Sequence, residues 1–318
     1  MLLVAPGLLA HATACRSRPA FARLARYAGA PAVSDDGIAA LVCAALGLRG
    51  TPPLGALTAA GAGLSPGTDY WMLADPVTLV AGRSDVALAG RVADLSAADA
   101  DELITALNAH FHGDGIMFVA ARPSLWLARV ATPPALTTVS LERAQNGPLA
   151  DALPRGDAAV QWRRWQDEIQ MLLHTHPVNA HREALGAPPA NAVWFSGGGR
   201  INDAGRPPLI EADAPGTPLG DLLRGVAYVS RLRGAIEPAR IVRVHAPIAG
   251  AADVDAFTER VFEPALGKLE RRELPALDLV ADGGGLAAGW RATAPGALTR
   301  LTARFGPRSF TVPGRAGT

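Results

Sequence analysis

The sequence predicts an α/β fold in which a mostly parallel sheet is flanked by helices and interrupted by an inserted α+β subdomain. At both ends of the chain, short apolar runs that end in turn-forming residues alternate with amphipathic helical stretches. The middle of the chain instead gives a strand, helix, strand, strand order with no crossover helix. A length of 318 residues and 49% hydrophobic residues suffice for such a core and insertion. We place the core at residues 1–84 and 187–318 and the insertion at residues 85–186.

The first strand of the core is the apolar run Leu2–Ala5, which Pro6 and Gly7 end. The same apolar start has a second interpretation, a secretory leader. No Lys or Arg precedes it and Pro6-Gly7 interrupts it, so we favour the buried strand. Helices are predicted at residues 20–28 and 36–48, and a Pro- and Gly-rich loop at residues 51–67.

The insertion and the second half of the core follow the same logic. Ser96 followed by Asp99 resembles a capping box and predicts a helix start. Apolar residues at helical spacing predict a long helix over residues 158–176, which Pro177 ends. Strands are predicted at 116–121, 126–130, 192–195, 239–245 and 276–281, helices at 219–229 and 254–269, loops at 196–200 and 202–218, and a frayed end at 314–318.

Composition excludes several classes of function. A net charge of +1 and the lack of a basic stripe argue against nucleic-acid binding. No apolar run is long enough to span a bilayer. Cys15 and Cys43 form no metal-binding or disulfide pattern and are interpreted as buried free thiols in a reducing cytoplasm.

The carboxyl ends of the core strands are where an α/β sheet binds ligands. Ser196, His245 and Asp282 carry the chemistry at these ends. Asp282 could bind a metal ion or cap a turn locally. The Ser-Gly-Gly-Gly run from Ser196 could bind an anion through backbone N–H groups or form a tight turn.

Two further groups have both a functional and a structural interpretation. Thr68 and Asp69 could act as a nucleophile with its neighbouring carboxylate, but from the sequence alone we favour an ordinary turn or helix cap. His174 and His176 lie two residues apart, so a regular helix directs them differently and they cannot share one metal. We expect Trp162, Trp165 and His176 to pack the long helix against the sheet.

The stretch LPRGDAAVQWRRWQDEIQMLLHTHPVNAHREALGAPPANAVWFSGGG, with ADPVTL at 74–79 and LNAHF at 107–111, resembles the proteobacterial RpfE-type regulatory proteins. That phosphoglycerate-mutase-like family is in turn similar to archaeal-type, cofactor-independent phosphoglycerate mutases. The resemblance implies an alkaline-phosphatase-like fold. In the active enzymes it implies a two-metal site with a Ser nucleophile.

Several positions that the resemblance assigns to metal ligands carry other residues here. The first strand ends at Pro6 where the enzymes have Asp, while Ile248 and Ala252 stand where they supply Asp and His. Asp282 is retained, but Gly283 replaces the following His. Thr68 matches the nucleophile. A chain without these ligands cannot neutralise the phosphoryl charge by metal.

We therefore expect a pseudoenzyme in the cytoplasm that acts by binding a small anion or a protein partner, with no cofactor. The alternative is an active mutase or phosphohydrolase that uses Thr68 and Asp69 with a divalent Mn, Mg or Zn ion. The expected ligand-binding residues come from the insertion, its junction with the core, and one strand end: Asn179, Arg182, Asn191, Ser196, Gly198, Arg200 and His245.

Overall fold

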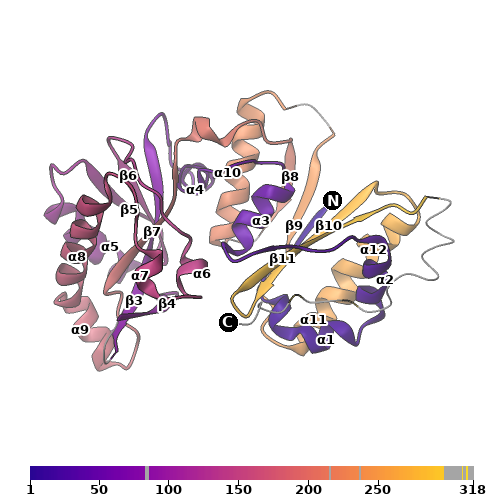
Figure 1. The fold of residues 1–318 in the computed structure, drawn as a ribbon, viewed down its shortest axis with the longest axis horizontal. Helices are drawn as coiled ribbons and strands as arrows, with labels where there is room; N and C mark the ends of the chain where they lie inside the picture. The colour runs from indigo at the N-terminus through magenta and orange to yellow at the C-terminus, as the bar shows by residue number, and fades with distance from the viewer. Residues whose placement is uncertain (83–85, 215, 236–237, 297–309, 311–312, 314–318) are drawn as a thin grey trace. The chain divides into compact units, whose positions relative to one another are not determined.

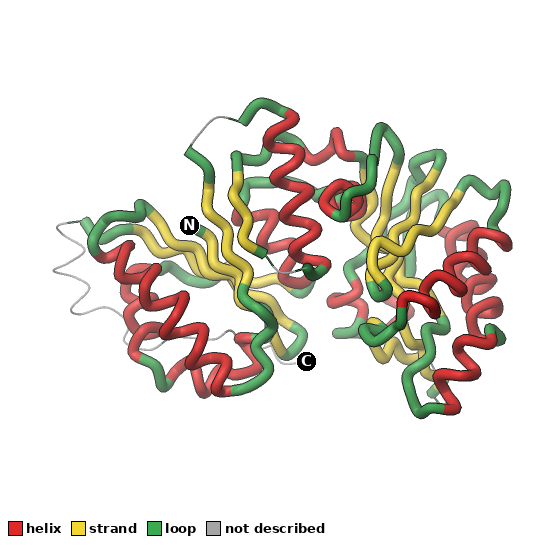
Figure 2. Tube along the Cα trace, turned by 180° about the vertical axis from the view of Figure 1, so that it is seen from behind, coloured by secondary structure: helices red, strands yellow, loops and turns green. Residues whose placement is uncertain are grey.

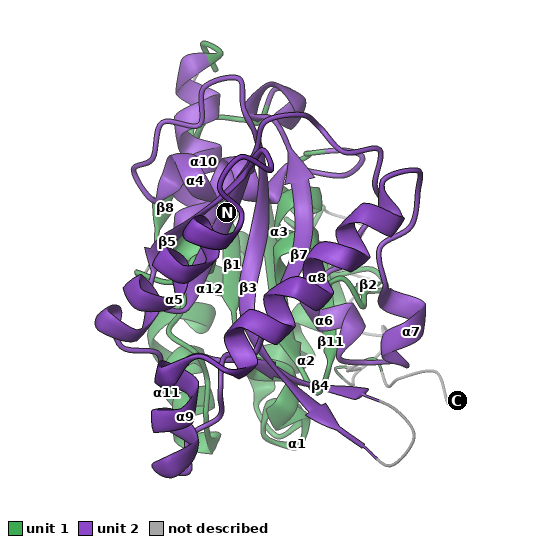
Figure 3. Cartoon of the chain, turned by 90° about the vertical axis from the view of Figure 1, so that its left-hand side faces the viewer, with its two compact units in different colours: residues 1–48, 207–220, 233–318 green, residues 49–206, 221–232 purple. Residues whose placement is uncertain are grey.

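The computed structural model describes residues 1–82, 86–214, 216–235, 238–296, 310 and 313 (Figures 1 and 2). The chain forms two units, coloured separately in Figure 3. Unit 1 contains residues 1–48, 207–220 and 233–318, and unit 2 contains residues 49–206 and 221–232. The frayed end predicted at residues 314–318 lies outside the described residues.

Unit 1 is built on a six-stranded mixed sheet. Its order is β2-β11-β10-β1-β9-β8, and β10, β1, β9 and β8 run parallel. β11 is antiparallel to both β10 and β2. The strands are β1 (Leu2–Ala5), β2 (Ala32–Ser34), β8 (Ile210–Asp213), β9 (Arg240–Val244), β10 (Ala276–Gly283) and β11 (Leu286–Thr293). The predicted α/β class and the joining of both chain ends in one sheet are confirmed.

Helices cover both faces of this sheet, as Figures 1 and 2 show. On one face, Phe21, Phe257 and Phe262 enter a core with the buried side chains of β1 and β10. On the other face lies α3, which contacts β10 and β11. The helices are a 3-10 turn (Leu8–His11), α1 (Ala12–Arg16), α2 (Pro19–Tyr27), α3 (Gly37–Ala45), α11 (Ala251–Phe257), a π-helical segment (Thr258–Phe262) and α12 (Glu263–Glu270).

Unit 2 is built on an antiparallel sheet. β3 is its central strand, and it pairs with β7 along one side and with β6 and β4 along the other. β5 pairs with β6. The strands are β3 (Tyr70–Ala81), β4 (Val86–Arg91), β5 (Ile116–Arg122), β6 (Leu125–Val130) and β7 (Ala192–Gly199). β3 and β7 lie on either side of the predicted insertion in sequence. β3 pairs with the insertion strands β4 and β6, and β7 pairs with β3, so unit 2 extends beyond residues 85–186.

Two helices, α5 and α8, cover one face of this sheet and form an aromatic core with it. Trp162 of α8 meets Phe195 of β7 edge-to-face, with ring centroids 4.9 Å apart. The predicted packing of Trp162 is confirmed. Ser96 caps α5 as predicted, because its side chain accepts the Asp99 N–H. The helices are α4 (Leu54–Gly61), α5 (Ala97–His110), α6 (Leu141–Ala144), α7 (Leu149–Ala152), α8 (Ala159–His174), α9 (Pro177–Ala184), a 3-10 turn (Ile201–Ala204) and α10 (Pro218–Leu232), of which residues 221–232 belong to unit 2.

Glycines allow the backbone of α4 to pack directly against the backbones of β3 and α10. A Cβ atom on Gly55 would lie 2.6 Å from the Cα of Met72 in β3. A Cβ atom on Gly225 of α10 would overlap the carbonyl group of Leu57, and one on Gly61 would overlap that of Asp221. Because real side chains do not tolerate such distances, α4 can occupy this position only with glycine at these contacts.

The buried carboxylate of Asp221 reinforces the contact between α4 and α10. It accepts hydrogen bonds from Arg122 Nε and Nη2 at 2.6 and 3.0 Å and from the guanidinium of Arg224. Arg224 Nε also donates to the carbonyl of Gly61. One fully buried acid therefore connects β5, α4 and α10 through charge-assisted bonds.

Several predicted loops are ordered elements. Residues 51–67 contain α4, and residues 202–218 contain a 3-10 turn and β8. The strand predicted to end at residue 195 continues to Gly199, so the loop predicted at 196–200 is wrong. Apolar periodicity is weak in Ala- and Gly-rich segments, and tertiary packing determines their conformation.

No helix within the described part of the chain combines the length and apolar character needed to cross a membrane.

Replacing Gly225 with Ala should destabilise unit 2. The new methyl group overlaps the Leu57 carbonyl, and forced overpacking of this kind costs about 1–3 kcal/mol. Gly147→Ala is a matched control, because nothing lies within 4 Å of its Cβ position. Urea unfolding should show a lower midpoint for Gly225→Ala and an unchanged one for Gly147→Ala. Equal midpoints would mean that α4 and α10 are not in backbone contact.

Candidate functional site

The carboxyl ends of β1, β9 and β10 meet in unit 1 and close on one another through the backbone. Asp282, at the end of β10, accepts the N–H of Gly7 through Oδ1 at 2.7 Å. Ile248 donates its N–H to the carbonyl of Pro6 at 2.8 Å. Gly7 has a φ of 80°, and a Cβ atom there would overlap the carbonyl of Ile248. Backbone groups therefore occupy the space at which side chains from three strand ends would converge.

Asp282 is the one carboxylate retained among the metal ligands that the resemblance implies, and the hydrogen bond from Gly7 holds it in place. Burial raises the pKa of the Asp282 carboxyl, and the hydrogen bond from Gly7 opposes that rise only in part. His245 lies at the end of β9, with its ring packed edge-to-face on Phe257 at 5.2 Å and its Nδ1 2.8 Å from the carbonyl of Ala246.

The described residues do not offer the donor set of a two-metal site. Across residues 1–82, 86–214, 216–235 and 238–296, no group of three or more His, Cys, Asp or Glu side chains is arranged to hold a metal ion. A site of this class needs several hard ligands around each ion. Asp282 alone does not meet that requirement.

Thr68 and Asp69 lie in unit 2, in the turn that precedes β3. The N–H of Asp69 donates to the carbonyl of Pro66 at 3.2 Å, which is the bond that closes the turn. Oδ2 of Asp69 lies 3.4 Å from Nε of Arg129, and both side chains are about half exposed. These contacts are those of an ordinary surface turn. The catalytic role of Thr68 and Asp69 stays a prediction.

The Ser-Gly-Gly-Gly run is part of β7 and pairs with β3, with Ser196 opposite Leu73 and Gly199 opposite Trp71. Gly197 and Gly199 make room for the start of α4: Cβ atoms there would lie 2.8 Å from Leu54 and 2.5 Å from Pro53. At Gly198 a Cβ atom would overlap the hydroxyl of Tyr70. The glycines therefore serve close packing. Arg200 follows, exposed, and its N–H donates to Asp203.

Asn179 and Arg182 of α9 are buried, and their polar groups have partners within unit 2. Asn179 bonds the carbonyls of Leu173 and Ala190 and accepts the N–H of Ala190, at 2.7 to 3.0 Å. Arg182 donates to the carbonyl of Pro188 at 2.9 Å and to Asp94 at 2.6 Å. The two side chains fasten α9 to the segment that leads into β7.

Asn191 extends the pairing of β3 with β7 by its side chain. Its amide accepts the N–H of Leu79 at 2.8 Å and donates to the carbonyl of the same residue at 2.9 Å. All of the bonds made by Asn179, Arg182 and Asn191 lie inside unit 2. Those from Asn179 to Ala190 and from Arg182 to Pro188 join residues of the predicted insertion to residues of the predicted core, and the ligand-binding junction stays a prediction. The prediction for His176 is wrong. It caps α9, where its Nδ1 accepts the N–H of Val178 at 3.3 Å.

Sequence reasoning missed a buried ion pair in β3. Asp75 is fully buried, and Arg91 of β4 places Nη2 3.0 Å from its Oδ1 without hydrogen-bond geometry. Burial raises the pKa of the Asp75 carboxyl, and attraction to Arg91 opposes the rise only in part. The sequence did contain a signal for this pair, because Asp75 is an acid inside the apolar run of residues 70–80. Such a run is typical of a central strand that is buried on both faces, so an acid within it needs a buried partner.

The two cysteines are buried and free, as predicted. Burial raises the pKa of the Cys15 thiol to about 11 and that of Cys43 to about 12. Both are therefore thiols rather than reactive thiolates at neutral pH.

Asn179→Ala should lower the stability of unit 2. It removes three buried hydrogen bonds and leaves the carbonyls of Leu173 and Ala190 without these partners, a loss of about 2–4 kcal/mol. His181→Ala, on the exposed side of the same helix, is the control and should lie within about 0.5 kcal/mol of wild type. Chemical denaturation measures both. A stable Asn179→Ala protein that loses ligand binding would instead support the predicted ligand-binding role.

The buried Asp75 predicts a pH dependence of stability. Its folded pKa lies above the unfolded value of 3.8, so the folded state favours the protonated carboxyl. This stabilising contribution is present below the unfolded pKa and is lost as the pH rises through the folded pKa. The stability of wild type relative to Asp75→Asn should therefore fall between pH 4 and neutrality, to be measured by urea denaturation at a series of pH values. A difference that grows over this range would contradict the raised pKa.

Three comparisons with known proteins bear on this arrangement. No protein-family model matches the chain. A 2,3-bisphosphoglycerate-independent phosphoglycerate mutase of Methanothrix thermoacetophila is 42% identical over 52 residues, which are 16% of this chain and 13% of that protein. A cofactor-independent phosphoglycerate mutase of Thermoplasma acidophilum aligns over 92% of this chain and 89% of its own, with 17% identity and a TM-score of 0.37. The PH0037 protein of Pyrococcus horikoshii aligns over 96% and 90%, with 16% identity and a TM-score of 0.49. In sequence, the chain is therefore similar to a phosphoglycerate mutase of this kind over a short segment.

Proposed function

We propose that this chain is a phosphoglycerate-mutase-like protein of the alkaline-phosphatase-like fold that acts by binding and has lost two-metal phosphoryl transfer. The RpfE-type regulatory character suggested by the stretch around residues 153–199 is part of the proposal. So is the absence of a resident divalent metal. The local identity to the Methanothrix mutase supports the relation to these enzymes.

The observation that carries the proposal is the closure of the strand ends in unit 1. The Gly7 amide binds the Asp282 carboxylate, and the Gly7 backbone packs directly against the carbonyl of Ile248. Pro6, Ile248 and Gly283 contribute no side-chain ligand at these ends. A metal ion here would find one carboxylate, of which one oxygen already accepts the Gly7 N–H.

Binding without catalysis also fits the electrostatics of this region. Within the described part of the chain, Asp282 contacts the Gly7 amide, and His245 contacts the Ala246 carbonyl and the Phe257 ring. None of these partners is a cationic group of the kind that stabilises a phosphoryl transition state. A hydroxyl such as that of Thr68 needs an adjacent base or a metal to become a nucleophile at neutral pH. The carboxylate next to it in sequence, Asp69, pairs with Arg129.

The proposal predicts that the purified protein has no mutase or phosphatase activity when Mn²⁺, Mg²⁺ or Zn²⁺ is added, and that it retains no stoichiometric metal. Phosphoglycerate isomerisation, hydrolysis of a phosphomonoester and metal content measure this. Asp282→Asn keeps an acceptor for Gly7 and should remain folded with unchanged metal content.

Turnover that disappears in Thr68→Ala would establish the alternative, an active mutase or phosphohydrolase, and would refute the proposal. Metal bound by wild type and lost in Asp282→Asn would refute the absence of a metal site even if no turnover were found.

A further inference from the structure

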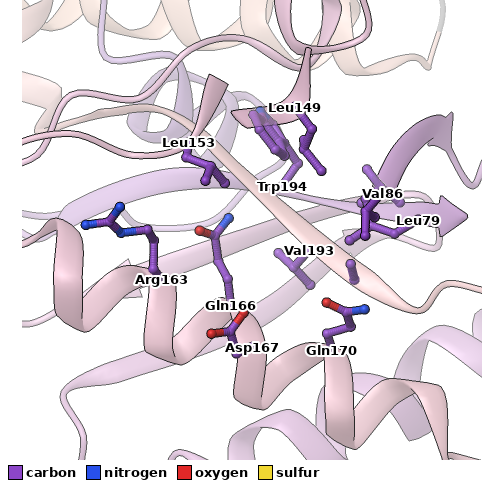
Figure 4. Close-up of a pocket in the computed structure, with 12 residues that line it drawn as sticks. Leu79, Val86, Leu149, Leu153, Arg163, Gln166, Asp167, Gln170, Val193 and Trp194 are labelled. Carbon is purple, nitrogen blue, oxygen red and sulfur yellow. The ribbon is translucent and has the colours of Figure 1, made fainter. Parts of the chain in front are cut away.

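A cavity of about 330 Å³ lies along the outer edge of β7 in unit 2 (Figure 4). Ala192 and Trp194, on one face of the strand, and Val193, on the other, all line it. Successive side chains of a strand point to opposite faces, so a cavity touched by both sets lies beside the strand. Leu149 and Leu153 close it from the side of α7. We call this space the β7-edge cavity.

The backbone of Val193 is directed into this cavity. Among the described strands, β7 pairs only with β3, and Val193 stands opposite Pro76. The carbonyl of Pro76 accepts the N–H of Val92, on the side away from β7. The pair Pro76–Val193 is therefore a non-hydrogen-bonded pair of the antiparallel ladder. The N–H and C=O of Val193 consequently point away from β3, to the open edge.

Gln166 of α8 supplies a second polar group that lacks a partner. Its Oε1 atom is buried and accepts no hydrogen bond from the described residues. Figure 4 shows its side chain directed from α8 toward the strand that carries Val193, with Gln170 one turn further along the helix. A buried acceptor left without a donor costs about 1–3 kcal/mol. A ligand that donates to Gln166 removes this penalty.

The remaining walls define the rest of the ligand. Trp194 gives its indole N–H to the carbonyl of Val139 at 3.0 Å, so its ring contributes an apolar surface. Leu149 and Leu153 are apolar as well. Arg163 and Asp167 carry opposite charges at the α8 wall, so the cavity selects neither an anion nor a cation. The cavity is at the small end of the range for ligand pockets.

We propose that the β7-edge cavity binds a neutral ligand with two secondary amides and apolar substituents. The N–H and C=O of one residue of this ligand match the open C=O and N–H of Val193, as in strand addition to a sheet edge. The N–H of the second amide donates to Gln166 Oε1. The apolar substituent lies against Trp194, Leu149 and Leu153. A free small amide and one residue of an extended peptide share this chemistry. The site lies in unit 2 and does not depend on the proposed loss of catalysis in unit 1.

Two neutral probes test the site: N-acetyl-leucine N-methylamide and the capped tripeptide N-acetyl-Leu-Val-Leu N-methylamide. Binding is followed by calorimetry and by the ¹H–¹⁵N resonance of the Val193 amide, which should move on saturation. Gln166→Leu keeps the size of the side chain but removes the acceptor, and should weaken binding roughly tenfold, as expected for one buried hydrogen bond. Gln161→Leu, the same change on the exposed side of α8, is the control and should bind as wild type does.

Folding of the variants is separable from binding. Because Gln166 Oε1 has no partner, Gln166→Leu should unfold at the same or a higher denaturant concentration than wild type. Tighter binding of the tripeptide than of the single residue identifies a peptide as the source of the amide, and comparable binding identifies a free small molecule. No saturable binding of either probe, or equal binding to wild type and Gln166→Leu, overturns the proposal.

Discussion

Backbone contact at α4 is the constraint on which the architecture of unit 2 depends. The helix meets β3 at Gly55 and α10 at Gly61 and Gly225, where a single methyl group would force the elements apart. At its start, the glycines of β7 leave room for Leu54 and Pro53. Close-packed interiors transmit such a requirement, because neighbouring elements cannot adjust independently. The position of β7, and with it the edge that borders the cavity, follows from how closely α4 approaches the sheet.

The glycine run at the end of β7 shows why a sequence pattern can suggest the wrong role. A strand followed by Ser-Gly-Gly-Gly is also what an anion-binding loop looks like. Glycine serves equally where backbone must approach backbone, and the two uses have the same local sequence. Only the partner distinguishes them, and the partner, α4, comes from residues 54–61, far away in the chain and predicted as a loop.

The elements that the sequence predicted well have strong periodicity or clear ends. β1, α5 and α8 are examples: an unbroken apolar run, a Ser cap, and apolar positions at helical spacing that end shortly before Pro177. α4 and β8 lack such signals, since their residues are small, polar or buried on all sides. The antiparallel β11 was missed because only its pairing with β10 and β2 distinguishes it from an irregular C-terminal segment.

The same distinction applies to the site. Reasoning from strand ends located Asp282 and His245 in unit 1, because topology alone brings those ends together. It could not find that Asp282 is engaged by Gly7, which depends on an amide 275 residues away in sequence. Asn179, Arg182 and Asn191 were expected to bind ligands because they were placed at a polar junction between the insertion and the core. Buried polar groups are far more often satisfied by backbone, as these three are.

The π-helical segment Thr258–Phe262 sets the phase of everything that follows it in the long helix of unit 1. Phe257 and Phe262 are five residues apart, yet their rings stack. The angle between the ring planes is 6° and the centroids are 5.9 Å apart. A regular α-helix turns by about 100° per residue, so positions five apart would face different directions. The segment thus acts as a one-residue insertion absorbed within the helix. Deleting one residue here would therefore restore a regular α-helix and keep the phase of α12, so that Leu266 and Leu269 would still face the core.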